Sequence, residues 1–284
     1  MTASLIDGKK IASDIRKGIK ISVSTNVLFK KRPPGLAVIL VGDDPASSIY
    51  VHHKQKACAD VGFHSRSFNL PNDTSESKLL SLIDELNEDA NIDGILVQLP
   101  LPMHIDPKKI IESISPTKDV DGFHPYNLGR LAQGHPALRP CTPYGVIQLL
   151  THYDIPIIGR HAIVVGASNI VGRPMALEFL LAKATVTICH RATQKLNELI
   201  PTADIVVVAT GSYNVIKPEW MHDKQTIIDI GMHRHQNGTI HGDVNFNEAI
   251  KKVRWITPVP GGVGPMTITT LLQNTLHAAY QHLA

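Results

Sequence analysis

The first half of the chain alternates short apolar runs with stripes of helical period. An apolar run bordered by glycine or proline is typical of a strand buried on both faces, and a stripe repeating every three or four residues is typical of an amphipathic helix. This pattern predicts a helix carrying Ile11, Ile15 and Ile19, a strand at 36–41, a helix from 45 to Gly62, a strand at 67–70, a helix with core positions 79, 82, 83 and 86, a strand at 94–99 and a short helix around 110–114.

The second half repeats the alternation after a loop-rich passage at 115–143, which holds five prolines and three glycines. Further strands are predicted at 161–165, 184–189, 204–209, 226–230 and 254–256, and a final helix at 267–282. Strands that alternate with helices favour parallel sheets. The fold class is therefore α/β: two α/β domains with a cleft between them, the second of Rossmann type, and a C-terminal helix that packs back on the first.

Composition narrows the classes of function. The chain has 284 residues, 43% of them hydrophobic, and a net charge of +3 without a basic block, which gives no support for binding to nucleic acid or to a membrane surface. Its 15 histidines are scattered without the spacing of a metal site, so no bound metal is expected. Cys58, Cys141 and Cys189 form no disulfide framework, and no signal peptide or membrane-spanning run is evident, which predicts a cytoplasmic protein.

Residues 164–175, VVGASNIVGRPM, are the most informative segment. An apolar strand ends at Gly166, and Gly172 opens a helix-like stretch, the arrangement in which backbone N–H groups and a helix N-terminus receive a pyrophosphate. The dinucleotide fingerprint is imperfect because Ser168 stands where a second glycine is usual. A plain αβ turn is the alternative, but the second strand that follows favours a nucleotide site.

The end of that second strand predicts which nucleotide binds. NAD sites usually carry an acid there for the ribose 2′-hydroxyl, whereas an arginine accommodates a 2′-phosphate. This chain has His190 and Arg191 at the tip and no acid. The sequence therefore predicts NADP, although Arg191 as a solvated loop charge remains the alternative.

Tyr50 and Lys54 are four residues apart on a predicted helix and so share one face. A Y-x-x-x-K pair also occurs in short-chain dehydrogenases, but there it follows the cofactor loop, and here it lies far upstream of Gly166. That order argues against the short-chain class. From spacing alone, an exposed amphipathic turn is an equally good interpretation.

Three further segments favour a substrate site. Gln98 lies at the carboxyl end of a buried strand, where α/β folds place ligands, and Asp121 precedes the flexible Gly122. A turn-forming role is the alternative for Asp121. Residues 257–267, TPVPGGVGPMT, hold three glycines and three prolines, whose backbone groups a ligand can approach closely.

Taken together, six segments resemble the bacterial bifunctional methylenetetrahydrofolate dehydrogenase/methenyltetrahydrofolate cyclohydrolase family. They are YVHHK at 50–54, VQLPLP at 97–102, KDVDGF at 118–123, PCTPYG at 140–145, GASNIVGRP at 166–174 and PGGVGPMT at 260–267. The resemblance covers essentially the whole chain in order. It implies a catalytic folate-binding domain at 1–138 plus 267–284 and an NADP-binding Rossmann domain at 139–266.

The resemblance also implies the reactions and the residues. Hydride passes from 5,10-methylenetetrahydrofolate to NADP, and water then opens the methenyl cation to 10-formyltetrahydrofolate. Lys54 is expected to shuttle protons, Gln98 to hold its amine, Asp121 to bind the pteridine and Tyr50 to contact the aminobenzoate ring. The expected substrate-binding residues are Tyr50, Lys54, Val97, Gln98, Leu99, Asp121, Pro260, Gly261, Gly262, Val263 and Gly264. The expected cofactor-binding residues are Thr142, Gly166, Ala167, Ser168, Ile170, Val171, Gly172, His190, Arg191, Gly211 and Met232.

The family further implies a homodimer and a place in one-carbon metabolism that serves purine, histidine and methionine biosynthesis. Three competing interpretations remain: a dehydrogenase without cyclohydrolase activity, an NADP-binding sensor without catalysis, and an unrelated NADP dehydrogenase acting on a hydroxy acid. An intact set of Tyr50, Lys54, Gln98 and Asp121 argues against the sensor. The hydroxy-acid reaction lacks a base, because the nucleotide half shows no His/Asp or Ser/Lys pair suited to it.

Overall fold

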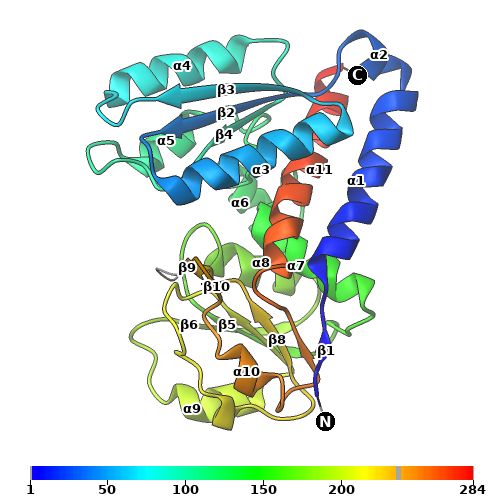
Figure 1. Ribbon diagram of the computed structural model, residues 1–284, viewed down its shortest axis with the longest axis vertical. Coiled ribbons are helices and arrows are strands. Elements are labelled where there is room, and N and C mark those ends of the chain that lie inside the picture. The colour runs from blue at the N-terminus through cyan, green and yellow to red at the C-terminus, as the bar shows by residue number, and fades with distance from the viewer. Residues whose placement is uncertain (1, 235–237, 284) are drawn as a thin grey trace. The chain divides into compact units, whose positions relative to one another are not determined.

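The computed structural model describes residues 2–234 and 238–283, which fold into two compact units (Figure 1). The six-stranded unit combines the N-terminal residues up to Ser13 with Thr142–Thr267. The three-stranded unit combines Asp14–Cys141 with the residues from Ile268 onward. Each unit is thus built from two separate stretches of chain.

The three-stranded unit holds a parallel sheet in the order β3-β2-β4. Its strands are β2 (Gly35–Val41), β3 (His64–Leu70) and β4 (Gly94–Val97). The helices within it are α2 (Val27–Lys31), α3 (Pro45–Val61), α4 (Glu76–Glu88), α5 (Pro107–Ser113) and α6 (Pro125–Ala132). The unit boundaries fall within α1 (Gly8–Thr25), α7 (Cys141–His152) and α11 (Val263–Leu283).

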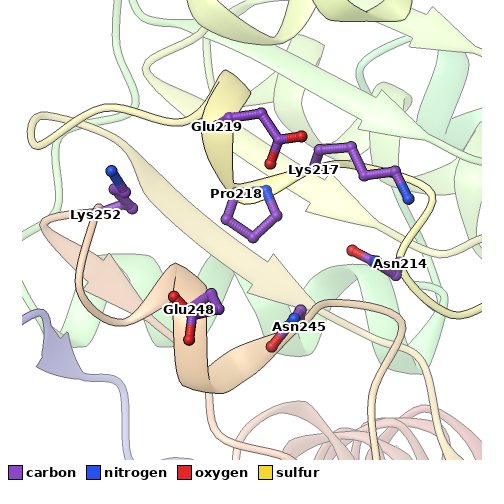
Figure 2. Close-up of a pocket in the computed structure, with 7 residues that line it drawn as sticks. All are labelled: Asn214, Lys217, Pro218, Glu219, Asn245, Glu248 and Lys252. Carbon is purple, nitrogen blue, oxygen red and sulfur yellow. The ribbon is translucent and has the colours of Figure 1, made fainter.

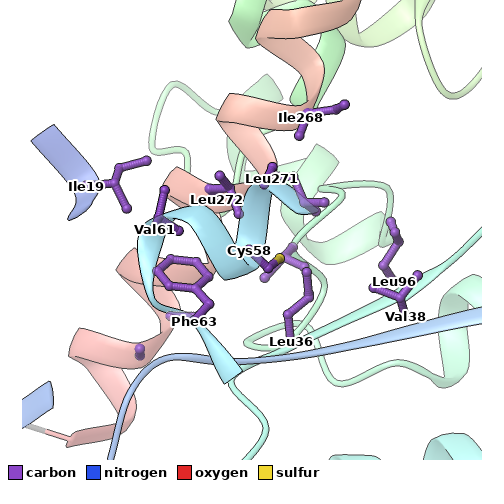
Figure 3. Close-up of a cluster of buried hydrophobic side chains, with 14 of the residues drawn as sticks. Ile19, Leu36, Val38, Cys58, Val61, Phe63, Leu96, Ile268, Leu271 and Leu272 are labelled. Atoms are coloured by element: carbon purple, nitrogen blue, oxygen red, sulfur yellow. The ribbon is translucent and has the colours of Figure 1, made fainter. Parts of the chain in front are cut away.

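Strand β2 is buried along its whole length, and its side chains alternate between two hydrophobic cores. Leu36, Val38 and Leu40 pack with residues of α3 and α11, and Figure 3 shows Leu36 and Val38 in this cluster. The intervening residues of β2 pack with α4 and α5 on the opposite face. A strand covered on both faces must be apolar at every position, which explains the continuous run at 36–41.

The C-terminal helix is fixed to this sheet by packing and by a buried carboxylate. Leu271 and Leu272 of α11 lie in the same cluster as Leu36 and Cys58 (Figure 3). Asp93 is fully buried and accepts two hydrogen bonds from the Arg32 guanidinium, at 2.9 and 2.8 Å. His282 Nδ1 of α11 lies 3.1 Å from Asp93 Oδ1. The prediction that the final helix packs back on the first α/β unit is confirmed.

The six-stranded unit contains a parallel sheet in the order β1-β11-β8-β7-β5-β6. Its strands are β1 (Ser4–Leu5), β5 (His161–Val165), β6 (Thr185–Cys189), β7 (Ile205–Val208), β8 (Thr226–Asp229) and β11 (Trp255–Ile256). A separate hairpin consists of β9 (His233–Arg234) and β10 (Ile240–His241). The short helices are α8 (Gly172–Leu181), α9 (Leu196–Leu199), η1 (Ile200–Thr202), η2 (Pro218–Trp220) and α10 (Phe246–Ala249).

The strand order of this sheet locates its binding crevice. From β5 the chain first forms β6 on one side, and then returns to form β7 on the other side. Ligands of open α/β sheets bind at such a switch point, outside the carboxyl ends of the strands. The loops that follow β5 and β7 therefore border the expected crevice, as in a Rossmann-type nucleotide-binding unit.

The α/β class, the parallel sheets and the Rossmann-type second sheet are confirmed, but local expectations differ from the structure. The strand expected at 94–99 ends at Val97, and the strand expected at 67–70 begins at His64. The N-terminal residues pair through β1 with β11, so they belong to the six-stranded unit rather than to a domain 1–138. The passage 115–143, expected to be loop, contains α6. The last helix begins at Val263 and not at 267, with Pro265 in its first turn, where a missing N–H costs no hydrogen bond.

Candidate functional site

Helix α3 carries Tyr50 and Lys54 on one face, as the spacing predicts. Asp44 caps the helix by accepting from Ser47 N, and Gly62 ends it in the left-handed conformation. Lys54 is only 4% exposed, and its Nζ lies 5.0 Å from the centre of the Tyr50 ring. The alternative of an exposed amphipathic turn is therefore wrong for Lys54.

Gln98 holds the Lys54 amine. Lys54 Nζ donates to Gln98 Oε1 at 3.0 Å, and Gln98 Nε2 donates to Leu99 O at 2.7 Å. The second bond fixes the orientation of the amide, so that its oxygen faces the lysine. Gln98 and Leu99 follow directly after the buried Val97 at the carboxyl end of β4. The end of this strand therefore positions the Gln98 amide that contacts Lys54 of α3.

Burial lowers the pKa of the Lys54 ammonium, because a charged amine loses its hydration there. The nearby charge of Asp121 opposes that change and raises the lysine pKa. Burial in turn raises the pKa of the Asp121 carboxyl, while Lys54 and the Cys141 thiol lower it. A lysine of lowered pKa can take up and release a proton near neutral pH, which an exposed lysine rarely does.

The segment before Asp121 is held by buried polar contacts. Asp119 accepts from His124 N at 2.8 Å and from Asn127 Nδ2 at 2.9 Å, and both Asp119 and Asn127 are buried. Lys118 Nζ donates to the carbonyls of Leu86 and Asp89. Lys118 and Asp119 of the KDVDGF motif thus hold the backbone of this segment in place by hydrogen bonds, and this positions Asp121.

Residues that the sequence reasoning missed complete this support. Asn274 of α11 donates to Val120 O at 2.8 Å and to Arg139 O at 2.7 Å. Cys141 N donates to Asp121 O, and its thiol donates to Val120 O. No local pattern identifies Asn274, because an asparagine within an amphipathic helix has no signature until its long-range partner is known.

The glycine-rich segment expected to bind substrate, Pro260–Gly264, belongs to the six-stranded unit. Gly261 has φ +111°, and its carbonyl accepts from Lys9 N at 3.1 Å. Val263 and Gly264 lie in the first turn of α11 rather than in a loop. Tyr50, Lys54, Gln98 and Asp121 belong to the other unit, so the predicted substrate residues divide into two groups.

The dinucleotide loop has the predicted strand–turn–helix form. It runs from β5 through Gly166, Ala167, Ser168, Ile170 and Val171 to Gly172, the first residue of α8. A Cβ on Gly172 would lie 2.0 Å from Gly166 O, so only glycine permits this turn. Ser168 Oγ accepts from Val171 N at 3.2 Å and Gly172 N at 3.3 Å, which explains a serine at the imperfect position of the fingerprint.

His190 and Arg191 follow β6 at the carboxyl edge of the same sheet, and both are exposed. His190 Nδ1 accepts from Ala192 N at 3.2 Å, and His190 N donates to Thr193 Oγ1 at 2.9 Å, so the turn is ordered by its own side chains. No acidic residue lies in this turn. An arginine there suits a 2′-phosphate, as predicted.

The other expected cofactor residues lie at the ends of neighbouring elements. Gly211 follows β7 and Met232 follows β8, so both are in carboxyl-end loops of the sheet. Thr142, near the start of α7, shares a hydrogen bond of 2.9 Å with Thr267. Among the described residues, no group of three or more His, Cys, Asp or Glu side chains is placed to hold a metal ion.

A separate cavity of about 460 Å³ lies in the six-stranded unit (Figure 2). Its walls are Asn214, Lys217, Pro218, Glu219, Asn245, Glu248 and Lys252. None of the residues expected to bind substrate or cofactor lines it. Its balanced charges offer no single-signed surface for an anionic nucleotide.

Comparison with known proteins decides the family. Residues 6–121 match the model of the tetrahydrofolate dehydrogenase/cyclohydrolase catalytic domain, and residues 140–283 match the model of its NAD(P)-binding domain. The chain belongs to the tetrahydrofolate dehydrogenase/cyclohydrolase family. The catalytic-domain match includes residues 14–121 of the three-stranded unit, and the NAD(P)-binding match includes residues 142–267 of the six-stranded unit together with residues 268–283 of the three-stranded unit.

Individual relatives cover the chain almost completely. The bifunctional protein FolD of Legionella pneumophila (strain Paris) is 58% identical over 279 residues, which are 98% of each chain. The crystal structure of the bifunctional enzyme FolD, a methylenetetrahydrofolate dehydrogenase/cyclohydrolase from Campylobacter jejuni, is 46% identical with a TM-score of 0.95, and covers 98% of this chain and 99% of that one.

A third relative was solved with ligands. The Trypanosoma brucei N5,N10-methylenetetrahydrofolate dehydrogenase-cyclohydrolase, complexed with NADP cofactor and inhibitor, is 36% identical with a TM-score of 0.95. The match covers 99% of this chain and 98% of that one. Within the described part of this chain, no helix has the length and apolar character needed to cross a membrane.

Proposed function

We propose that this chain oxidises 5,10-methylenetetrahydrofolate with NADP and then hydrolyses the methenyl product to 10-formyltetrahydrofolate. The observation that carries the proposal is the buried Lys54, held by Gln98 and placed against Tyr50. A dehydrogenase without a hydrolytic step has no need for a lysine of lowered pKa. The bifunctional activity named for the relatives supports the same assignment.

In the dehydrogenase step, NADP held by the turn from Gly166 to Gly172 and by Arg191 would supply the acceptor for a hydride from the one-carbon bridge of the substrate. The adjacent nitrogen lone pairs stabilise the cation that forms, so the protein chiefly has to position the substrate. Asp121 accepts from the 2-amino group and ring N–H of the pteridine. Tyr50 packs against the aminobenzoate ring, and Val97 and Leu99 border the ring at the edge of β4.

In the cyclohydrolase step, Lys54 moves the protons. Neutral Lys54 takes a proton from the water whose oxygen bonds to the methenyl carbon. The oxygen of the new hydroxyl then forms the formyl C=O and releases its proton to solvent water, the C–N5 bond breaks with its electron pair returning to N5, and the lysine ammonium delivers a proton there. Burial favours the neutral amine at the start of this sequence, and Gln98 Oε1 stabilises the ammonium that forms within it.

The residues at the carboxyl edge of the six-stranded sheet fit NADP. The tight turn from Gly166 to Gly172 leaves no room for a Cβ, and it ends at the N-terminus of α8, where a pyrophosphate is favourably bound. Arg191 binds the 2′-phosphate, and His190, Gly211, Met232 and Thr142 border the rest of the cofactor. Pro260, Gly261, Gly262, Val263 and Gly264 are assigned to the folate.

We further propose a homodimer. Strand β6 is an edge of its sheet, and its unpaired backbone groups can extend the sheet into a second copy. Two apolar side chains are exposed on it and on α8: Ile188 at 41% and Leu180 at 59%. Ile188→Lys is expected to shift the protein to monomer in analytical ultracentrifugation, and an unchanged dimer would contradict this interface.

The protein is proposed to act in the cytoplasm, in the interconversion of tetrahydrofolate derivatives that supplies purine, histidine and methionine biosynthesis. Its three cysteines are all free and buried, which suits a reducing compartment. Growth of a strain depleted of the protein, with and without purines, histidine and methionine, tests this assignment.

A spectrophotometric assay tests the enzymatic proposal. Purified protein with methylenetetrahydrofolate is expected to reduce NADP faster than NAD, and the absorbance of added methenyltetrahydrofolate is expected to fall faster than in the blank. NADP reduction without methenyl hydrolysis would indicate a monofunctional dehydrogenase. NADP binding with neither reaction would indicate a sensor.

A further inference from the structure

Asp243, which no motif identified, lies between two loops of the six-stranded unit. It follows β10 and is fully buried. One loop, residues 209–214, follows β7, and the other segment, residues 230–233, follows β8 and ends at His233, the first residue of β9. We call them the β7 loop and the β8 loop; they contain Gly211 and Met232, respectively.

The Asp243 carboxylate is saturated by these loops. Its Oδ2 accepts from Thr210 N at 2.6 Å, from Thr210 Oγ1 at 2.9 Å and from Gly211 N at 3.0 Å. Its Oδ1 accepts from His233 Nε2 at 2.7 Å, so the nucleotide half does contain a His/Asp pair, which was not expected from the sequence because the two residues are ten positions apart. Because a carboxylate only accepts, all four groups act as donors, and one buried charge joins the two loops.

The backbone of Asp243 makes the same connection. Its carbonyl accepts from Asn214 N at 2.6 Å, and its amide donates to Asp229 Oδ1 at 2.9 Å, at the end of β8. Gly231 packs so closely against Asp243 that an added Cβ would lie 2.1 Å from Oδ1. The β8 loop therefore touches the carboxylate through both Gly231 and His233.

Stacked rings join the two loops a second time. Tyr213 of the β7 loop meets His241 edge to face at 4.9 Å, and His241 stacks on His233 at 5.1 Å. His233 thus contacts both the carboxylate and the aromatic stack. The geometry gives the two loops one fixed arrangement.

The position of the β7 loop places this fixed arrangement beside the expected nucleotide crevice. The chain reverses its strand order between β5 and β7, so the β7 loop borders the crevice opposite the dinucleotide loop. We propose that Asp243 is a positioning residue for the dinucleotide: with His233 it fixes the β7 and β8 loops in the conformation that receives NADP. This inference rests on the proposed NADP-dependent function, and Asp243 itself contacts no substrate.

Asp243→Ala and Asp243→Asn test the proposal, with NADP affinity measured by isothermal titration calorimetry. Alanine removes every side-chain acceptor, so the Kd for NADP is expected to rise about tenfold. Asparagine keeps an oxygen for the β7 loop and offers an amide N–H that His233 Nε2 can accept, so it is expected to restore most of the affinity. Methenyltetrahydrofolate hydrolysis, which uses no NADP, is expected to stay within about twofold of wild type in both variants.

Amide hydrogen exchange without NADP gives a second measurement. Asp243→Ala is expected to speed exchange at Thr210 and Gly211, whose N–H groups lose their acceptor, while amides of the three-stranded unit keep their rates. A folded alanine variant with wild-type NADP affinity, or an asparagine variant as weak as alanine, would overturn the proposal.

If the Asp243→Ala protein is unfolded and therefore has no hydrolase activity, substitutions of the half-buried His233 test the proposal instead. His233→Leu is expected to raise the Kd for NADP about threefold, and His233→Gln, which can still donate to Asp243, to restore it. Arg234→Leu at the exposed neighbouring position is the matched control. Unchanged affinity in His233→Leu would overturn the inference. A wild-type chain that binds no NADP would instead refute the proposed function on which it rests.

Discussion

The two units differ in how far their functional side chains are buried. In the three-stranded unit the reactive side chain, Lys54, is almost completely buried and already hydrogen-bonded to Gln98. In the six-stranded unit Ser168, His190 and Arg191 are exposed, and the side chains of Ser168 and His190 order their turns by accepting hydrogen bonds from backbone N–H groups. Proton transfer by a lysine is favoured by the lowered pKa that burial gives its amine, whereas phosphate binding requires N–H groups and a guanidinium that the ligand can reach.

The sharpest test of this contrast is Lys54→Met, which keeps the length of the side chain and removes the titratable amine. Hydrolysis of methenyltetrahydrofolate is expected to fall by roughly 100-fold or more, the usual loss for a general acid–base group. NADP reduction is expected to suffer less, because hydride transfer depends on positioning. Lys56→Met, at an exposed position of the same helix, is the control. A folded Lys54→Met protein with full hydrolase activity would exclude Lys54 as the catalyst.

The next largest effect is expected in the six-stranded unit, at the exposed Arg191. Arg191→Ala is expected to raise KM for NADP about 30-fold and to leave KM for NAD nearly unchanged, because only NADP carries the 2′-phosphate. Lys195→Ala is a matched control, since its ammonium is already paired with Glu198 at 3.1 Å. Equal losses with both cofactors would show that Arg191 does not contact the phosphate.

Asp121→Asn is expected to weaken folate binding about tenfold in both reactions, because its amide presents a donor toward two donors of the pteridine. Asp60→Asn, exposed on α3, serves as control. Unchanged binding in a folate titration would return Asp121 to the turn-forming role.

The same variant has a pH consequence. The charge of Asp121 raises the lysine pKa, against the larger lowering by burial, so its removal lowers the pKa of Lys54 further. Hydrolysis needs the neutral amine and increases as pH rises through that pKa. The rising limb of the kcat/KM profile is therefore expected to move to lower pH in Asp121→Asn, and a shift to higher pH would contradict the assignment of Lys54 as base.

The smallest effect is expected at Ser168. Ser168→Ala removes the acceptor of Val171 N and Gly172 N and is expected to raise the Kd for NADP about fivefold, as for the loss of a helix cap. Asn169→Ala is the neighbouring control. No change would mean that the backbone alone holds the turn.

Much of this organisation could be predicted from sequence, because it depends on local patterns. The strand at 161–165 has the predicted bounds, and the four-residue spacing of Tyr50 and Lys54 placed them on one face. The position of Gln98 followed from the rule that ligand groups lie at the carboxyl ends of strands, whereas its contact with Lys54 was predicted from the family resemblance.

What the sequence did not predict depends on distant partners or on unusual caps. A two-residue strand such as β1 has no periodicity, and only its pairing with β11 defines it. Helix α6 was hidden by prolines and glycines, although Pro125 at its first turn is a start signal; its cap is the ring of His124, which accepts from Tyr126 N. Asp243 resembles any loop acid until its four donors are known.

The discontinuous make-up of the units has a consequence for synthesis on the ribosome. The six-stranded unit is complete in sequence once Thr267 has been added, because its other piece is the N-terminus. The three-stranded unit still lacks the end of α11, including Leu271, Leu272 and the His282 that contacts Asp93. All three strands of the three-stranded unit are therefore synthesised before β5, yet this unit is the last to close its core, because the end of α11 is added only after the six-stranded unit is complete.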